Sequence, residues 1–178
     1  MEIKTETEVK IRVSEEGLSS IRVKLRELGF LQKAERAKEE NLLFDFSSGK
    51  LTESGSALRL RRYGSKQLLT FKGPRIEDAR LKIREEIETG IDDFVVMRRI
   101  LESLGMSTCF EYGKYREKFR LSDGTREVEV CIDETPVGCF VEIEGSAFSI
   151  EEVAHALGWT PDQFINKNYI DLYKERTT

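Results

Sequence analysis

Hydrophobic and polar residues alternate along most of the chain. Near its start, the charged residues Glu6, Glu8 and Lys10 alternate with the hydrophobic residues Val9 and Ile11. A period of two places the two sets on opposite faces of a β-strand. Similar patterns, separated by turn residues, predict further strands. The predicted strands cover residues 1–13, 39–46, 57–63, 66–72, 79–89, 109–121, 125–133 and 138–145. Because short turns connect most of them, we expect about eight antiparallel strands.

Only a few segments have the spacing of an amphipathic helix. One begins near Ser14 and is followed by Gly29, a common stop signal. Another begins with a capping-box pattern of Ser149 and Glu152. We expect helices over residues 14–28, 92–104, 149–157 and 160–166, whereas residues 168–173 fit either a helix or a turn.

The polar faces of the predicted strands carry a dense set of charges of both signs. Their opposite faces are apolar and need a cover, which the few helices supply. In one arrangement, an open sheet turns the charged face to solvent. In the other, the sheet closes into a barrel with the charges inside and the helices outside. Periodicity alone favours the open sheet, because a charged interior is costly unless its charges are paired or bind a ligand. The residues assigned to this face are Glu6, Glu8, Lys10, Arg59, Arg61, Lys72, Arg84, Glu86, Glu88, Lys114, Arg116, Lys118, Glu127, Glu129, Asp133, Glu142 and Glu144.

The composition excludes several classes of function. The 178 residues include 29 lysines and arginines against 33 aspartates and glutamates, which gives a net charge of −4. This balance argues against a basic nucleic-acid-binding surface and against disorder caused by excess charge. No apolar run could span a membrane, and the first residues do not resemble a secretory leader. We therefore expect one cytoplasmic domain, residues 1–178, with no nucleic-acid or membrane partner. A homodimer stays open.

Cysteine and histidine chemistry has few residues to draw on. Cys109, Cys131 and Cys139 form no C-x-x-C pair, and His155 is the only histidine. A tetrahedral zinc site therefore lacks ligands. A hydrolase triad would have to use His155, which the pattern places on a helix. Carboxylates, lysines and arginines remain, and they favour a hard metal ion with an anionic substrate.

The first strand carries an E-x-E-x-K pattern. Two carboxylates two residues apart point to the same side of a strand, with their Cα atoms roughly 7 Å apart. Glu6 and Glu8 could hold a hard cation, and Lys10 could hold a phosphate oxygen. Six further segments follow in order: Arg59-Leu60-Arg61, residues 70–74, 84–88 and 114–119, Ile132-Asp133, and residues 138–145. This ordered set resembles the CYTH family, the triphosphate tunnel metalloenzymes, over nearly the whole chain.

The resemblance implies a fold and a chemistry. It implies an α+β, mainly β, fold: a closed eight-stranded antiparallel β-barrel, the triphosphate tunnel, with helices packed outside. The implied cofactor is Mg²⁺ or Mn²⁺, and the implied ligand is a small-molecule triphosphate such as ATP, thiamine triphosphate or tripolyphosphate. The implied metal ligands are Glu6, Glu8, Glu142 and Glu144. The implied substrate-binding residues are Lys10, Arg59, Arg61, Lys72, Lys114 and Arg116. Lys10 and Asp133 are the implied catalytic residues, with Asp133 either orienting or deprotonating a nucleophile, or helping to bind a second ion.

Three reactions stay open at this point. The first is hydrolysis of an inorganic or organic triphosphate. The second is cyclisation of ATP to cyclic AMP and pyrophosphate, because the chain looks closest to the class IV adenylyl cyclase-like branch. The third is binding of polyphosphate or nucleotide without catalysis. One departure is visible, since Asn168-Tyr169 stands where relatives often have a Ser-Tyr pair. The resemblance gives no role to Arg84, Glu86, Glu88, Lys118 or Glu129.

Overall fold

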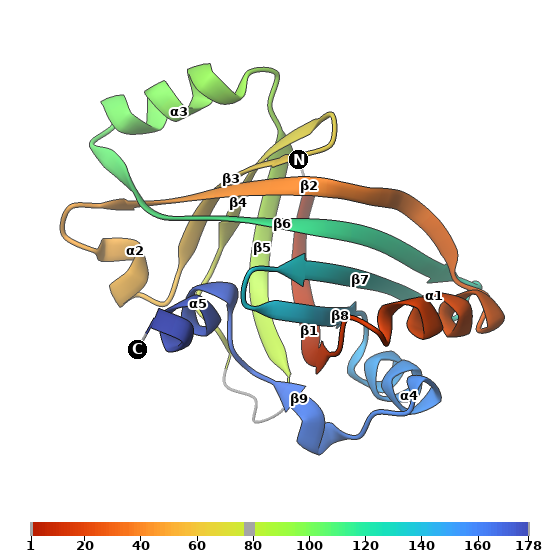
Figure 1. Cartoon of the computed structure of the whole chain (residues 1–178). Helices are drawn as coiled ribbons and strands as arrows, with labels where there is room; N and C mark the ends of the chain where they lie inside the picture. The colour runs from red at the N-terminus through yellow and green to blue at the C-terminus, as the bar shows by residue number, and fades with distance from the viewer. Residues whose placement is uncertain (1, 77–80, 178) are drawn as a thin grey trace. The chain divides into compact units, whose positions relative to one another are not determined.

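The computed structural model describes residues 2–76 and 81–177. Its strands are β1 (Glu2–Val13), β2 (Leu31–Phe46), β3 (Ala57–Tyr63), β4 (Lys66–Lys72), β5 (Lys82–Gly90), β6 (Met106–Ser122), β7 (Glu127–Thr135), β8 (Gly138–Glu144) and β9 (Phe164–Ile165). They form one sheet in the order β5-β4-β3-β2-β6-β7-β8-β1-β9, and β5 also pairs with β1 (Figure 1). The ladder of the eight longer strands thus closes on itself. The predicted closed eight-stranded antiparallel barrel is confirmed.

The chain divides into two compact units, each built from separate segments. Unit 1 comprises Met1–Glu6, Lys38–Ile76 and Ile83–Gly113, and unit 2 comprises the rest of the chain. Strands β1, β2, β5 and β6 are divided, so that each contributes one part to each unit. The one-domain expectation stays a prediction, and each unit is described by itself below.

In unit 1, helices α2 (Lys50–Glu53) and α3 (Phe94–Ser103) pack on β3. The core between these elements is formed by Leu42, Phe44, Leu60, Leu101 and Met106. Helix α3 begins where the pattern predicts. The Asp93 side chain accepts hydrogen bonds from the backbone N–H groups of Val95 and Val96, at 2.8 and 2.9 Å.

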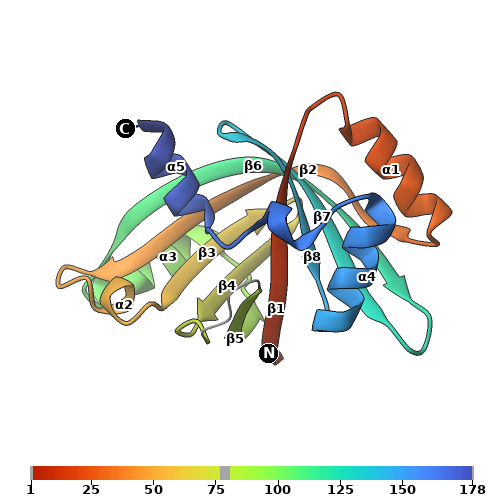
Figure 2. The same ribbon diagram turned by 90° about the horizontal axis from the view of Figure 1, so that it is seen from below.

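In unit 2, α4 (Ala147–Leu157) packs on β7, β8 and α1 (Leu18–Glu27). Figure 2 shows α1 and α4 lying side by side. The apolar faces of β1, β7 and β8 are buried, as the alternation predicts. They include Val9, Ile11, Val128, Val130, Ile132, Val141 and Ile143. The helices therefore cover the apolar strand faces, and the polar faces point the other way.

Several element boundaries differ from the predictions. Strand β2 begins eight residues before the predicted start at Glu39. The prediction missed the first half of this strand because that half is mostly exposed and shows no alternation. The N-cap of α4 is Ser146, whose hydroxyl accepts from Ser149 N, so the predicted capping box at Ser149 is wrong. Residues 160–166 form a single 3₁₀ turn (Pro161–Gln163) followed by β9 instead of a helix. Helix α5 (Tyr169–Thr177) settles the ambiguity at residues 168–173. The predicted start of a strand at residues 79–80 lies outside the described residues.

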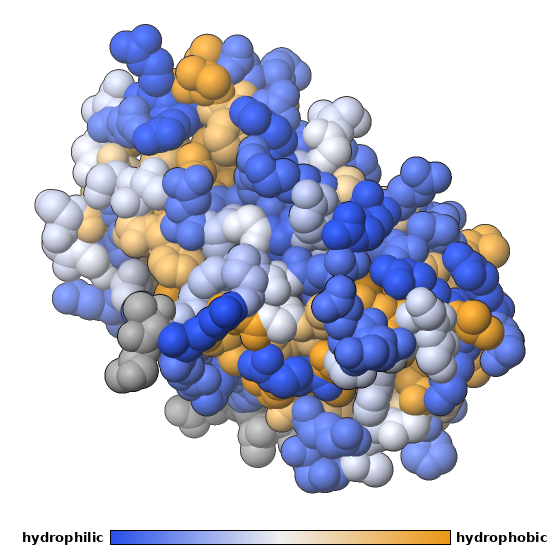
Figure 3. Space-filling model, in the orientation of Figure 1, coloured by the Kyte–Doolittle hydropathy of each residue, from blue (hydrophilic) through white to orange (hydrophobic). Residues whose placement is uncertain are grey.

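In the described parts of the chain, no helix is long and apolar enough to cross a membrane. The face in Figure 3 mixes hydrophilic and hydrophobic residues. The exposed apolar residues include Val96, Ile100 and Leu104, which are spaced by four along and just after α3.

Candidate functional site

The polar face of unit 1 is set by the register of β3, β4 and β5. Arg59 pairs with Thr70, which pairs in turn with Glu88, and Lys72 pairs with Glu86. Directly paired residues of antiparallel strands point to the same face. The alternation pattern therefore assigned these charged residues to the correct strand face.

Lys72 lies between two carboxylates. Its Nζ donates to both Glu6 oxygens at 2.7 and 2.6 Å, and it lies 2.6 Å from Oε2 of Glu86. Burial acts to raise the pKa of Glu86, but Lys72 and Arg59 outweigh it and lower that pKa to about 2. Glu6, a predicted metal ligand, is thus held by a predicted substrate-binding lysine.

Arg59 and Arg61 are two residues apart on the same face of β3. Arg61 donates to Glu88 at 2.7 Å and lies 3.7 Å from Glu39, yet its Nε is buried without a hydrogen-bond acceptor among the described residues. The Nε of Arg59 is buried in the same way. A buried N–H without an acceptor costs about 1–3 kcal/mol. An anionic ligand with oxygen acceptors would remove this cost.

Sequence reasoning missed two polar residues of unit 1. Glu39 and Asn41 on β2 are both fully buried, and Asn41 Nδ2 donates to Glu39 Oε1 at 3.0 Å. Asn41 pairs directly with Arg61, so it shares the polar face. Their spacing was the available sequence signal, because Glu39 and Asn41 are two residues apart and so point to one face of β2, as the charged residues of β3 do.

In unit 2, the register of β1, β8 and β7 aligns the polar residues in rows. Lys10 pairs with Glu142, which pairs with Cys131. Two residues earlier on β1, Glu8 pairs with Glu144, which pairs with Glu129. Burial raises the pKa of Cys131, so its thiol keeps its proton and is no nucleophile.

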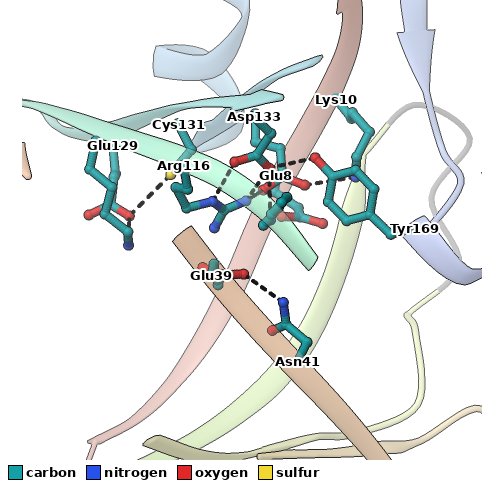
Figure 4. A network of polar contacts seen from close by, with 12 residues as sticks. Glu8, Lys10, Glu39, Asn41, Arg116, Glu129, Cys131, Asp133 and Tyr169 are labelled. Carbon is teal, nitrogen blue, oxygen red and sulfur yellow. Dashed lines mark hydrogen bonds and ion pairs between the residues drawn. The ribbon is translucent and has the colours of Figure 1, made fainter. Parts of the chain in front are cut away.

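Asp133 is the centre of the unit 2 network, as Figure 4 shows. Its oxygens accept from Lys114 Nζ at 2.8 Å, from Arg116 Nε at 2.6 Å and NH2 at 2.5 Å, and from Tyr169 Oη at 2.5 Å. Asp133 is fully buried. Because a carboxylate has about four lone-pair positions, these four bonds leave little capacity for another donor. Asp133 can therefore accept a proton from a nucleophile only after one of these donors has moved.

Lys10 and Glu142 form a second buried pair in the same network. Their charged atoms are 2.8 Å apart, and Arg116 also donates to Glu142. Burial acts to lower the pKa of Lys10, but Glu142 and Glu8 outweigh it and raise that pKa. Burial acts to raise the pKa of Glu142, but Lys10 and Arg116 hold it well below its usual range. Both groups are charged at neutral pH.

Lys82 is a further buried cation that the sequence analysis did not single out. Its Nζ donates to Oε1 of Glu8 at 3.0 Å. Burial lowers the pKa of Lys82 to about 8. Its parity with Arg84 and Glu86 was the available signal, since residues two apart on a strand share a face.

The carboxylates of Glu8, Glu144 and Glu129 lie in one row, and their chemistry can be compared with what the expected metal ion requires. Glu8 and Glu144 stand directly opposite each other across β1 and β8. Like charges in this position are destabilising unless a cation lies near them. An all-oxygen donor set suits Mg²⁺ or Mn²⁺, so the residues fit the implied ion. Among residues 2–76 and 81–177, however, no three His, Cys, Asp or Glu side chains converge as metal ligands. Glu8 would have to exchange Lys82 for the ion.

The structure distributes the predicted site residues over both units. Glu6, Arg59, Arg61 and Lys72 belong to unit 1. Unit 2 contains Glu8, Lys10, Lys114, Arg116, Asp133, Glu142 and Glu144.

Among the residues left without a role, Glu86 and Glu88 pair with Lys72 and Arg61, and Lys118 pairs with Glu129 at 2.6 Å. Arg84 is buried on the strand that carries Glu86. Glu127 is exposed and pairs with Arg120.

Comparison with known proteins gives a consistent result. A family model described as CYTH domain matches residues 4–159. A protein of Methanocaldococcus jannaschii named "putative adenylate cyclase" is 31% identical over 176 residues, which cover 93% of this chain and 97% of that protein.

Two solved structures share the fold. One, from Vibrio parahaemolyticus and also named a "putative adenylate cyclase", has a TM-score of 0.81 at 18% identity, with 96% of this chain and 98% of that chain covered. The other, from Hippeastrum, has a TM-score of 0.68 at 18% identity, with 96% of each chain covered. That protein is described as a "putative adenylyl cyclase" that reveals a dominant triphosphatase activity.

Proposed function

Because this chain belongs to the CYTH family, we propose that it is a metal-dependent enzyme that hydrolyses inorganic or organic triphosphates. The observation that carries the proposal is the pair of buried guanidinium groups on β3. Arg59 and Arg61 each keep a buried Nε–H without an acceptor among the described residues. Phosphate oxygens are suitable acceptors, because guanidinium groups bind them through paired hydrogen bonds.

The basic residues of unit 2 support an anionic substrate as well. Lys10, Lys114 and Arg116 are buried and held by carboxylates. We assign them the role of phosphate ligands that leave Asp133 and Glu142 for the substrate. The same role is assigned to Arg59, Arg61 and Lys72 in unit 1. Catalysis would then depend on positioning and electrostatic stabilisation of the transferred phosphoryl group.

The proposed metal ion is Mg²⁺ or Mn²⁺. Its proposed ligands in unit 2 are Glu8, Glu142 and Glu144, and Glu6 of unit 1 stays a proposed ligand as well. When bound, such an ion neutralises charge on phosphate oxygens and can activate water. Glu8 is released for this role if Lys82 turns to the substrate. Asp133 would orient the basic residues and, once relieved of a donor, could accept a proton from the nucleophile.

Cyclisation of ATP is the second candidate, and the names of the relatives from Methanocaldococcus jannaschii and Vibrio parahaemolyticus favour it. The same phosphate ligands could present the α-phosphorus to the ribose hydroxyl. The triphosphatase activity described for the Hippeastrum protein favours hydrolysis.

A binder without catalysis would need only the basic residues. We place the protein in the cytoplasm as a working proposal.

Product analysis separates these reactions. The protein is incubated with tripolyphosphate, thiamine triphosphate or ATP, each with Mg²⁺ or Mn²⁺ and with a chelator control, and products are identified by ³¹P NMR. We expect orthophosphate without cyclic AMP, and no product with the chelator. Cyclic AMP with pyrophosphate would establish the cyclase instead. Binding of tripolyphosphate without any turnover would leave the non-catalytic binder.

A further inference from the structure

Helix α5 begins with a tyrosine whose place is fixed by local hydrogen bonds. Asn168 and Asp171 bond reciprocally: Asp171 N donates to Asn168 Oδ1 at 2.8 Å, and Asn168 N donates to Asp171 Oδ2 at 3.2 Å. Such a reciprocal cap fixes where a helix starts. Tyr169, the first residue of α5, is buried in unit 2.

The Tyr169 ring lies beside two ammonium groups. Lys10 Nζ is 4.3 Å and Lys114 Nζ is 4.4 Å from its centroid. Both distances lie well inside the range for cation–π attraction. Phe140 packs edge-on against the ring, with centroids 5.7 Å apart and an interplanar angle of 77°. Because Phe140 is fully buried, the ring has a rigid support.

The Tyr169 hydroxyl has a separate partner. It donates to Asp133 Oδ2 at 2.5 Å, on the oxygen that also accepts from Lys114. Burial and the nearby carboxylates Asp133 and Glu142 raise the pKa of Tyr169 well above its usual value. The phenol therefore keeps its proton and acts as the donor in this bond.

We propose that Tyr169 is a positioning residue for triphosphate turnover. Its ring holds the ammonium groups of Lys10 and Lys114 at a set spacing, and its hydroxyl holds the carboxylate of Asp133. Helix α5 thereby completes the cationic network of unit 2. The inference rests on the proposed function, because that function makes Lys10 and Lys114 phosphate ligands.

Two substitutions separate the ring from the hydroxyl. Tyr169→Phe keeps the ring and removes the bond to Asp133, whereas Tyr169→Leu removes both. For Tyr169→Phe we expect the Kd of metal-free tripolyphosphate, measured by calorimetry with chelator, to stay within about twofold, while kcat falls about tenfold. For Tyr169→Leu we expect the Kd to rise about tenfold as well. A residue that only stabilised the fold would not split the two parameters.

Tyr115 provides matched controls. It is an exposed tyrosine of unit 2 with the Arg36 guanidinium 3.9 Å from its ring centroid. Tyr115→Phe and Tyr115→Leu remove the same groups outside the Asp133 network. We expect neither to change kcat or the Kd of tripolyphosphate by more than about twofold, because exposed pairs contribute little.

A spectroscopic measurement tests the geometry independently of turnover. The CεH₂ NMR signals of ¹³C-labelled Lys10 and Lys114 should carry a ring-current shift that Tyr169→Phe retains and Tyr169→Leu loses. If Tyr169→Leu leaves these signals, kcat and the Kd unchanged, the inference is wrong. If wild-type protein neither binds nor turns over any triphosphate, the proposed function fails. The lysine signals then still decide whether Tyr169 holds the two ammonium groups.

Discussion

Two buried aspartates, one in each unit, each accept four hydrogen bonds from very different donors. Asp45 in unit 1 accepts from the backbone N–H groups of Phe46, Leu51 and Thr52 and from the Thr52 hydroxyl. Asp133 in unit 2 accepts all its bonds from the side chains of Lys114, Arg116 and Tyr169.

We infer from this difference that Asp45 carries a structural charge and Asp133 a functional one. Three of the four donors of Asp45 are backbone N–H groups in or next to α2, so they cannot leave without unfolding that segment. Two of the three donors of Asp133 are cations on flexible side chains, which can turn to a phosphate while the strands stay in place. We therefore propose that Asp133 belongs to a ligand site, whereas Asp45 fixes the turn before α2.

The largest expected effect comes from the carboxylates that face each other across β1 and β8. We expect Glu8→Ala and Glu144→Ala to abolish turnover, because they remove the proposed metal ligands. The measurements are product formation with Mg²⁺ or Mn²⁺ and direct Mn²⁺ binding by electron paramagnetic resonance. Glu127→Ala, which removes an exposed glutamate of β7, should leave both unchanged. Full activity of Glu8→Ala would overturn the metal assignment.

Asp133→Asn tests the functional side of the comparison directly. The amide keeps the size of the side chain, but it carries no charge and turns an N–H group toward cationic donors. We expect turnover to fall by at least about 100-fold, because the basic residues lose their common acceptor. Leaving buried cations uncompensated should also lower the free energy of unfolding by about 3–5 kcal/mol, measured with urea. Wild-type kcat in this variant would contradict the role given to Asp133.

Arg59→Ala tests whether the buried guanidinium groups of unit 1 bind the substrate. We expect the Kd of tripolyphosphate to rise about 10- to 100-fold, because hydrogen bonds to a charged group are strong when buried. Arg62→Ala is the matched control, since Arg62 is an exposed residue of β3 that pairs with Glu40 at 3.5 Å. It should change the Kd by no more than about twofold. Equal effects of the two variants would remove Arg59 from the substrate-binding set.

Alternation alone predicted the faces of most strands, because a period of two fixes which side chains point together once a strand exists. Arg59, Lys72, Glu86 and Glu142 all lie on the predicted polar face. Alternation did not predict the first half of β2. That segment is mostly exposed, so no burial pattern marks it as a strand.

The contacts that build the unit 2 network could not be read from periodicity. Tyr169 meets Asp133 across 36 positions of sequence, and Lys82 meets Glu8 across 74. Such contacts depend on how the chain folds back, which local patterns do not encode. Parity made Lys82 visible as a polar-face residue, but it did not name Glu8 as its partner.

Asp45→Asn should have the smallest effect on turnover of all these variants. It tests whether Asp45, unlike Asp133, has a purely structural role. Burial acts to raise the pKa of Asp45, but the hydrogen bonds from Thr52 and the neighbouring backbone N–H groups outweigh it and lower that pKa. A carboxylate with a lowered folded pKa stabilises the protein above its unfolded pKa of about 3.9, and this contribution is lost as the pH falls through the folded value. We expect Asp45→Asn to lower the free energy of unfolding by about 1–3 kcal/mol at pH 7, and the difference from wild type to shrink below about pH 4. Urea unfolding between pH 3 and pH 7 measures both, and kcat at neutral pH should stay unchanged. A fall in kcat like that of Asp133→Asn would show that the backbone-bound aspartate is functional too, and the distinction between the two aspartates would fail.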